Sequence, residues 1–325
     1  MLRSAQISIL FSNIGTLISV VSNMVILYFG ITEIIAGNLT IGEFTILSLY
    51  FSNIMNSIKY FLVYSNEFQN VKAAYNRILE WLSIDVEQNA ELVINKISDI
   101  RIENLIFGYP DNNLLYKGLN YTFSSGNIYQ IKGVNGSGKS TLINILIGLY
   151  NNNFEGNVIF NNISIKNLNM YNIRTNLIGV TEQEPILLQD SIFNNITYNI
   201  NEIDKLKMKE YIKILNLELF IENLPNGINT EILSKNYNLS GGEKQKLSLL
   251  RTLLKNPDLI ILDEVTSALD KSTTNNLKSL IESIKEDKII IIIDHNDNFK
   301  DIVDFVIDID ELRVNMDNKL TRERT

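Results

Sequence analysis

Nine residues near the middle of the chain have the types and spacing that can wrap around a phosphate group. Residues 133–141 read Gly-Val-Asn-Gly-Ser-Gly-Lys-Ser-Thr, after a β-like run at 128–133 and before a helical run at 142–149. Glycines let backbone N–H groups turn inward around a phosphate, and the N-terminus of the following helix adds partial positive charge. The order strand, glycine loop, helix therefore predicts a loop that binds ATP.

Two side chains of this loop have specific expected contacts. Lys139 should bridge the β- and γ-phosphates, and the hydroxyl of Ser140 should ligate Mg²⁺. The loop residues expected to bind the nucleotide are Asn135, Gly136, Ser137, Gly138, Lys139, Ser140 and Thr141.

A pair of acids, Asp263 and Glu264, follows the apolar run Leu259–Leu262. Four consecutive apolar residues predict a buried strand. Asp263, at its carboxyl end, is expected to hold Mg²⁺, and Glu264 to orient or deprotonate an attacking water. Alone, this string could equally be a core strand that ends in two surface acids, but the phosphate loop upstream favours the catalytic interpretation.

About a hundred residues after the loop, the chain reads Leu-Ser-Gly-Gly-Glu at 239–243. Together with the loop, this string resembles the ATP-binding cassette (ABC) proteins of the exporter type, whose signature usually ends in Gln. The resemblance implies that Ser240, Gly241 and Gly242 face the γ-phosphate held by a partner domain. A second nucleotide-binding domain, identical or similar, is therefore an expected partner. The segment 267–270 resembles the D-loop of the family.

Three single residues also match the family by position. Gln183 resembles the Q-loop glutamine that senses Mg²⁺ and the attacking water, and Tyr109 resembles the aromatic residue that stacks on adenine. His295, the only histidine, resembles the switch histidine that contacts the γ-phosphate. Taken singly, such residues more often serve in loops or packing. The resemblance implies catalytic roles for Lys139, Gln183, Glu264 and His295, and metal-binding roles for Ser140, Gln183 and Asp263.

Two long apolar stretches lie in the first 64 residues of the chain. No Asp, Glu, Lys or Arg occurs in the 29 residues from Ser4 to Thr32, and a helix that spans a bilayer needs only about 20. A second apolar stretch covers 41–64, with 15 uncharged residues between Glu43 and Lys59. We expect two membrane-spanning helices, and the flanking basic residues place both ends in the cytoplasm. The alternative is a buried helical hairpin in a soluble protein.

These elements predict two domains. Residues 1–90 would form a partial transmembrane domain with two spanning helices and a cytoplasmic extension. Residues 97–325 would form an α/β nucleotide-binding domain with a largely parallel sheet. The predicted fold is thus an α/β P-loop ATPase domain of the ABC type, with a helical insert around 185–250, preceded by an all-α transmembrane hairpin.

Composition limits the other classes of function. The chain has no Cys, which excludes disulfides and thiolate metal sites. Its net charge is −8 and its pI is near 4.9, whereas a nucleic-acid partner usually leaves a basic footprint. This balance, with the uncharged head, argues against a soluble cassette ATPase of DNA repair or translation.

Three features depart from the exporter pattern. An exporter half has six spanning helices, whereas this chain has room for two. The loop at 230–236 reads Thr-Glu-Ile-Leu-Ser-Lys-Asn and lacks both glycines of the usual exporter loop. Asp294 precedes His295, where a Ser or Thr is usual.

The expected function is ATP-driven closure of two head-to-tail domains at a cell membrane, coupled to export of an unknown substrate, with a peptide as one candidate. The alternative is a truncated or split-gene product that binds ATP. Such a product would need a partner chain with the missing helices, or would not transport.

Overall fold

The computed structural model describes residues 2–84, 86–87, 90–109, 114–150, 153–200, 202–232, 239–294 and 297–311, with the side chains at 2–15, 59, 61–63 and 65–67 excepted. The chain divides into two compact units, Met1–Glu87 and Gln88–Thr325, and each is described by itself.

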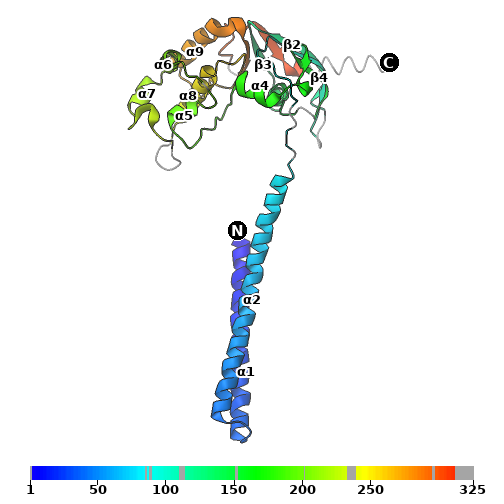
Figure 1. The fold of residues 1–325 in the computed structure, drawn as a ribbon, viewed down its shortest axis with the longest axis vertical. Coiled ribbons are helices and arrows are strands. Elements are labelled where there is room, and N and C mark those ends of the chain that lie inside the picture. The colour runs from blue at the N-terminus through cyan, green and yellow to red at the C-terminus, as the bar shows by residue number, and fades with distance from the viewer. Residues whose placement is uncertain are drawn as a thin grey trace, which may run out of the picture. The chain divides into compact units, whose positions relative to one another are not determined.

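The first unit is a pair of long helices that pack side by side, α1 (Leu2–Ile35) and α2 (Ile41–Leu82) (Figure 1). Thr40 caps α2: its hydroxyl accepts the Glu43 N–H, and the Glu43 carboxylate accepts the Thr40 N–H. A Cβ atom on Gly30 would lie 2.0 Å from the ring of Phe44. Glycine at that position is therefore what lets the two helices approach closely near the turn.

Among the described residues, one helical segment is long and apolar enough to cross a membrane. It is Thr16–Ile35, with a mean hydropathy of 1.8, and none of it is buried. A largely apolar helix with no buried residue is typical of a membrane span. The predicted second span does not meet the same criterion within the described part of α2, so it stays a prediction. The predicted span and its polar extension form one continuous helix of 42 residues.

The second unit is built on a parallel sheet of five strands. In spatial order they are β6 (Ile178–Thr181), β7 (Leu259–Asp263), β8 (Ile289–Ile293), β3 (Asn127–Lys132) and β9 (Phe305–Asp308). Because the strands are parallel, their carboxyl ends all lie at the same end of the sheet. The predicted phosphate loop, which follows β3, and the two acids at the end of β7 both lie there.

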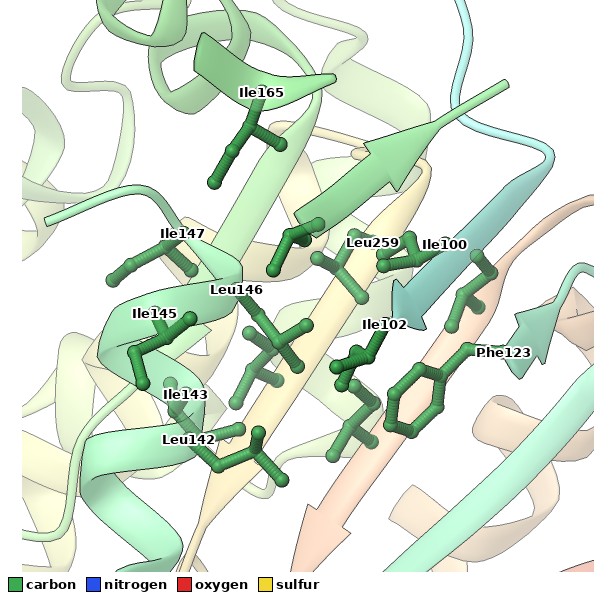
Figure 2. Close-up of a cluster of buried hydrophobic side chains, with 14 of the residues drawn as sticks. Ile100, Ile102, Phe123, Leu142, Ile143, Ile145, Leu146, Ile147, Ile165 and Leu259 are labelled. Atoms are coloured by element: carbon green, nitrogen blue, oxygen red, sulfur yellow. The ribbon is translucent and has the colours of Figure 1, made fainter. Parts of the chain in front are cut away.

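Both faces of this sheet are buried. All five isoleucines of β8 are buried; Ile289, Ile291 and Ile293 pack into one apolar cluster, while Ile290 and Ile292 pack into another. Figure 2 shows the first cluster, where Leu142 and Leu146 of the helix after the loop lie among residues of several strands. Burial on both sides explains why the strand sequence is a continuous apolar run.

A second, antiparallel sheet covers this first cluster. Its order is β2 (Tyr116–Ser124), β1 (Asp99–Phe107), β4 (Glu155–Phe160) and β5 (Ile163–Ser164). Ile100, Ile102 and Phe123 contribute its buried side chains. The sequence indicated a largely parallel sheet and missed this second one, whose strands β1 and β2 mix buried with partly buried residues.

The helices confirm the predicted insert. Between β6 and β7 lie α5 (Ile192–Ile196), α6 (Lys205–Ile214), α7 (Glu218–Glu222) and α8 (Gly241–Leu254), with the 3₁₀ turn Gly227–Asn229. The other helical elements are α3 (Lys139–Leu146), α4 (Met170–Asn176), α9 (Lys271–Ile284) and two 3₁₀ turns at Ile165–Asn167 and Lys285–Asp287. The fold class is therefore α/β with a helical insert, preceded by two helices.

Candidate nucleotide-binding site

The glycine loop lies between the end of β3 and the first turn of α3. Gly138 has φ +107°, a conformation that L side chains rarely adopt. An added Cβ there would lie 2.6 Å from Leu115 and 2.8 Å from the Tyr116 hydroxyl. That hydroxyl donates to the Gly138 carbonyl at 2.8 Å. The loop is therefore held at Gly138 by Tyr116 of β2.

Two features of the loop fit a bound phosphate. The first turn of α3 has no side-chain cap among the described residues, so its N–H groups remain for an external acceptor. The Ser137 hydroxyl is buried, and no described group forms a hydrogen bond with it. Buried polar atoms normally have a partner, and a phosphate oxygen would supply one here.

Lys139 is buried, and its ammonium group lies across the start of the loop. It donates to the carbonyls of Gly133 at 2.8 Å and Val134 at 3.2 Å. These two acceptors replace some of the water that the charge loses on burial. A nucleotide could take their place without unfolding the loop.

Asp263, the last residue of β7, and Glu264, which follows it, lie at the same end of the sheet as the loop. Glu264 has φ +47°, a left-handed conformation that is uncommon for residues other than glycine. Its N–H donates to the Ile293 carbonyl at the end of β8, at 2.8 Å. The unusual backbone is thus held by the neighbouring strand, and such strain is frequent at functional sites.

Gln183 lies against Glu264. Its Nε2 donates to Glu264 Oε2 at 2.6 Å, although the two residues are 81 positions apart in the chain. Parallel pairing of β6 with β7 explains the approach, because both side chains follow the ends of adjacent strands. The structure therefore brings two of the expected catalytic residues into direct contact.

The residues expected to hold Mg²⁺ are oxygen donors at this edge. Asp263 ends β7 and Ser140 lies in the first turn of α3; carboxylate and hydroxyl oxygens suit Mg²⁺. No group of three or more His, Cys, Asp or Glu that could hold a metal occurs in the described part of the chain. Mg²⁺ bound to a nucleotide needs only one or two protein ligands besides phosphates and water, so this donor set fits it.

Tyr109 is held by other aromatic residues and by the helix of the loop. Its ring is edge-on to Phe107 and Tyr150, with centroids 5.2 and 6.3 Å away. Its hydroxyl is 3.0 Å from Thr141 Oγ1, and this hydrogen bond lowers the pKa of Tyr109. Tyr109 as a whole remains 38% exposed, which leaves area for a base to stack.

The signature segment forms the start of α8. Ser240 caps the helix: its hydroxyl accepts the Glu243 N–H at 3.3 Å, and Glu243 Oε2 accepts the Ser240 N–H at 2.7 Å. An added Cβ on Gly242 would lie 2.7 Å from the Ala268 carbonyl, whereas no described atom lies within 4 Å of one on Gly241. The helix start is therefore braced on the D-loop on one side.

Two expectations fall outside the described residues. His295 is one, and 233–238, most of the unusual loop, is the other. The Asp294 side chain is described and buried: its Oδ2 accepts the Asn298 N–H at 2.9 Å, and its Oδ1 is 3.5 Å from the Thr266 hydroxyl. This carboxylate therefore links the end of β8 to Asn298 and Thr266.

Two acids near the loop were missed by the sequence analysis. Asp310 Oδ2 accepts the Val134 N–H at 2.8 Å, and Asp297 pairs with Lys132 at the end of β3, which lowers the pKa of Asp297. The one available signal was position, because Asp310 follows the apolar Ile309 two residues after β9. Neither acid belongs to a motif.

Comparison with known proteins gives a consistent result. Residues 116–267 match the family described as ABC transporter. The chain is 32% identical over 291 residues to ABC transporter B family member 1 of Dictyostelium discoideum, covering 88% of this chain and 32% of that protein. It is 29% identical over 298 residues to the ATP-dependent lipid A-core flippase of Syntrophus aciditrophicus, covering 90% of this chain and 49% of the flippase.

A solved structure of a bacterial Atm1-family ABC exporter with ATP bound is also similar. Its TM-score is 0.64 at 25% identity, over 89% of this chain and 54% of that one. The chain thus spans between about a third and about half of the length of these relatives.

Proposed function

This chain belongs to the ABC transporter family, and we propose that it binds and hydrolyses ATP and uses that reaction to export a substrate across a membrane. The observation that supports this most directly is the contact between Gln183 and Glu264. It places a carboxylate in a fixed orientation at the sheet edge that also carries the phosphate loop.

The proposed chemistry is in-line attack of water on the γ-phosphate. Lys139 would leave the carbonyls of Gly133 and Val134 and bind the β- and γ-phosphates. Glu264 would accept a proton from the water, and Gln183 would keep the Glu264 carboxylate turned toward it. Tyr109 would stack on adenine, and His295 would contact the γ-phosphate.

Ser140 and Asp263, with Gln183 close by, would hold Mg²⁺. The ion supplies positive charge that neutralises the phosphate oxygens. The loop amides of 135–141 would surround the phosphates, with Ser137 donating from its buried hydroxyl.

We propose a second nucleotide-binding domain as the partner. Ser240, Gly241 and Gly242 would face the ATP held by that domain, since the start of α8 presents a hydroxyl and N–H groups to an anion. ATP would then close two domains head to tail, and hydrolysis would open them.

We place the first unit in a cell membrane. The exposed apolar surface of α1 supports this, with Leu17, Met24 and Phe29 each more than half exposed. Lipid or further membrane helices would cover that surface.

The test is Glu264→Gln in the full chain, purified in detergent micelles. The amide keeps the shape of the carboxylate but cannot accept a proton, so phosphate release should fall by about 10²- to 10⁴-fold. ATP binding should remain, and an ATP-dependent dimer should accumulate in light scattering. Glu282→Gln, on the exposed face of α9, is the control. Wild-type turnover in Glu264→Gln would show that another residue is the base.

A further inference from the structure

Two aspartates of the C-terminal segment hold the two ends of β3. Asp304 Oδ2 accepts the N–H of Ile128 near the start of the strand, at 2.8 Å. Asp310 Oδ2 accepts the N–H of Val134 just beyond its end, also at 2.8 Å. The two contacts are chemically alike, but only Asp310 touches the phosphate loop.

Asp310 itself is firmly placed. It follows β9, which pairs with β3 in parallel, with Lys132 opposite Asp308. The Asp310 N–H donates to Asp308 Oδ1 at 2.9 Å, and the neighbouring Ile309 is buried. The carboxylate therefore lies two residues beyond β9, the strand adjacent to the one that leads into the loop.

The start of the loop is held from two sides. Lys139 holds the carbonyls of Gly133 and Val134, and Asp310 holds the Val134 N–H. A Cβ atom on Gly133 would lie 3.2 Å from Asp310 Oδ2 and 2.6 Å from Ser137 Oγ, so the carboxylate lies directly against the loop. If Lys139 turned to a phosphate, its two contacts would be lost, whereas that of Asp310 does not depend on Lys139.

We propose that Asp310 is a positioning residue for nucleotide binding, which keeps the start of the phosphate loop in its binding conformation while Lys139 is released to the phosphates. This inference rests on the proposed function, namely that the loop binds ATP. Asp310 acts through the backbone of Val134 and touches no reacting atom, so it should affect ATP affinity more than turnover.

The hydrogen bond and the charge can be separated by substitution. Asp310→Ala removes the acceptor and should weaken ATP binding about five- to tenfold. Asp310→Asn keeps an oxygen acceptor and removes a negative charge near the triphosphate, so its affinity should equal or exceed that of the wild type. Asp304→Ala is the control, because it removes the same kind of contact from the other end of β3, together with an ion pair to Lys285.

The experiment uses the full chain in detergent micelles. A fluorescent ATP analogue gives Kd, phosphate release gives kcat and KM, and thermal unfolding by circular dichroism gives Tm. We expect Asp310→Ala to raise Kd and KM, while its kcat stays within about twofold of the wild-type value. Asp310→Asn should return Kd and KM to the wild-type values. Asp304→Ala should lower Tm and leave Kd unchanged. If Asp310→Ala does not fold, Asp310→Glu is used in its place. Its additional methylene group displaces the carboxylate from the Val134 N–H, so this variant should also raise Kd.

An unchanged Kd in Asp310→Ala would overturn the inference, and so would an equal rise in Asp304→Ala, which would point to general loosening of β3. Lys139→Ala distinguishes this from failure of the proposed function. If Lys139→Ala loses at least tenfold in affinity while Asp310→Ala does not change, only the role of Asp310 is wrong. If the wild type binds no ATP, the proposed function is wrong as well.

Discussion

Glu243 places a carboxylate in the first turn of α8, where the family signature usually has a neutral glutamine. Its Oε2 accepts the Ser240 N–H, and an amide oxygen could accept the same hydrogen bond. The two residue types therefore differ at this site mainly in charge. A negative charge at a helix N-terminus is favourable in itself, but it would repel a phosphate that approaches from a partner domain.

We therefore expect Glu243→Gln to favour ATP-driven dimerisation. In a Glu264→Gln background, the ATP concentration at half-dimerisation should fall about two- to fivefold, the equivalent of about 0.3–1 kcal/mol. Light scattering during an ATP titration measures this. The difference should shrink as salt rises, because the charge is exposed to screening. A midpoint that does not move, or that moves equally in Glu282→Gln, would contradict the role of the charge.

Single residues of the site differ in how far the sequence reveals them. Lys139 and Glu264 stand in strings whose spacing indicates their chemistry, and Gln183 could be selected by its position. The contact between Gln183 and Glu264 could not be predicted, because it depends on β6 lying next to β7. Asp310 is 176 positions from Val134, and its contact depends on β9 pairing with β3, which no local pattern encodes.

At the scale of elements, patterns that one strand carries by itself were easiest to predict. The run Leu259–Leu262 indicated a buried strand, and β7 is buried on both faces. The antiparallel sheet was harder, since β1 is interrupted by a register shift between Ile102 and Leu105, where Asn104 has φ +49°. Such a bulge breaks the alternation by which a half-buried strand is identified.

Two neighbouring glycines of α8 allow an internally controlled test of its contact with the D-loop. Gly242→Ala would place a Cβ atom 2.7 Å from the Ala268 carbonyl, whereas a Cβ atom on Gly241 meets no described atom within 4 Å. We expect Gly242→Ala to lower the free energy of unfolding by about 1–3 kcal/mol. Gly241→Ala should be neutral or raise it by up to about 1 kcal/mol.

Chemical denaturation of the full chain in micelles measures both glycine variants. The opposite order of stability would mean that α8 does not pack on Ala268 as described.

Lys255 links α8 to its neighbours and gives the unit a pH dependence. Its ammonium donates to the carbonyls of Arg174 and Ile178, and burial lowers its pKa to about 8, below about 10.4 in an unfolded chain. Between these values the unfolded chain binds more protons, so this group makes stability rise with pH. Below pH 8 the cost of burying the charge is present in full.

Lys255→Met should remove this contribution. As pH rises from about 8 to about 10.4, the unfolding free energy of the wild type should increase relative to that of the variant. Urea denaturation at four pH values measures it, with Lys278→Met, at an exposed ion pair with Asp301, as the control. A difference that is flat with pH would mean that Lys255 titrates normally.

At the scale of the whole molecule, one unit buries its apolar side chains and the other exposes them. The second unit encloses its isoleucines and leucines on both faces of a sheet, whereas the first exposes them along α1. We expect the expressed chain to be recovered with membranes and to need detergent for extraction. Recovery in the soluble fraction without detergent would contradict the membrane assignment.

A charge within the exposed segment sharpens this test. Val25→Arg lies near the centre of Thr16–Ile35, where an arginine costs about 2.5–3.5 kcal/mol of insertion free energy, so the fraction that resists alkaline extraction should fall. Leu206→Arg, on the exposed face of α6, is the matched control and should leave that fraction unchanged.

The unbroken course of α2 has a mechanical consequence. Its 42 residues, at about 1.5 Å each, make a rod of about 63 Å, and the helix contains neither proline nor a described interruption. A rod of that length amplifies movement: a tilt of about 5° at one end displaces the other by about 5 Å. A displacement of Leu82 would therefore be transmitted along the continuous helix and would move its other end, at Thr40, as well.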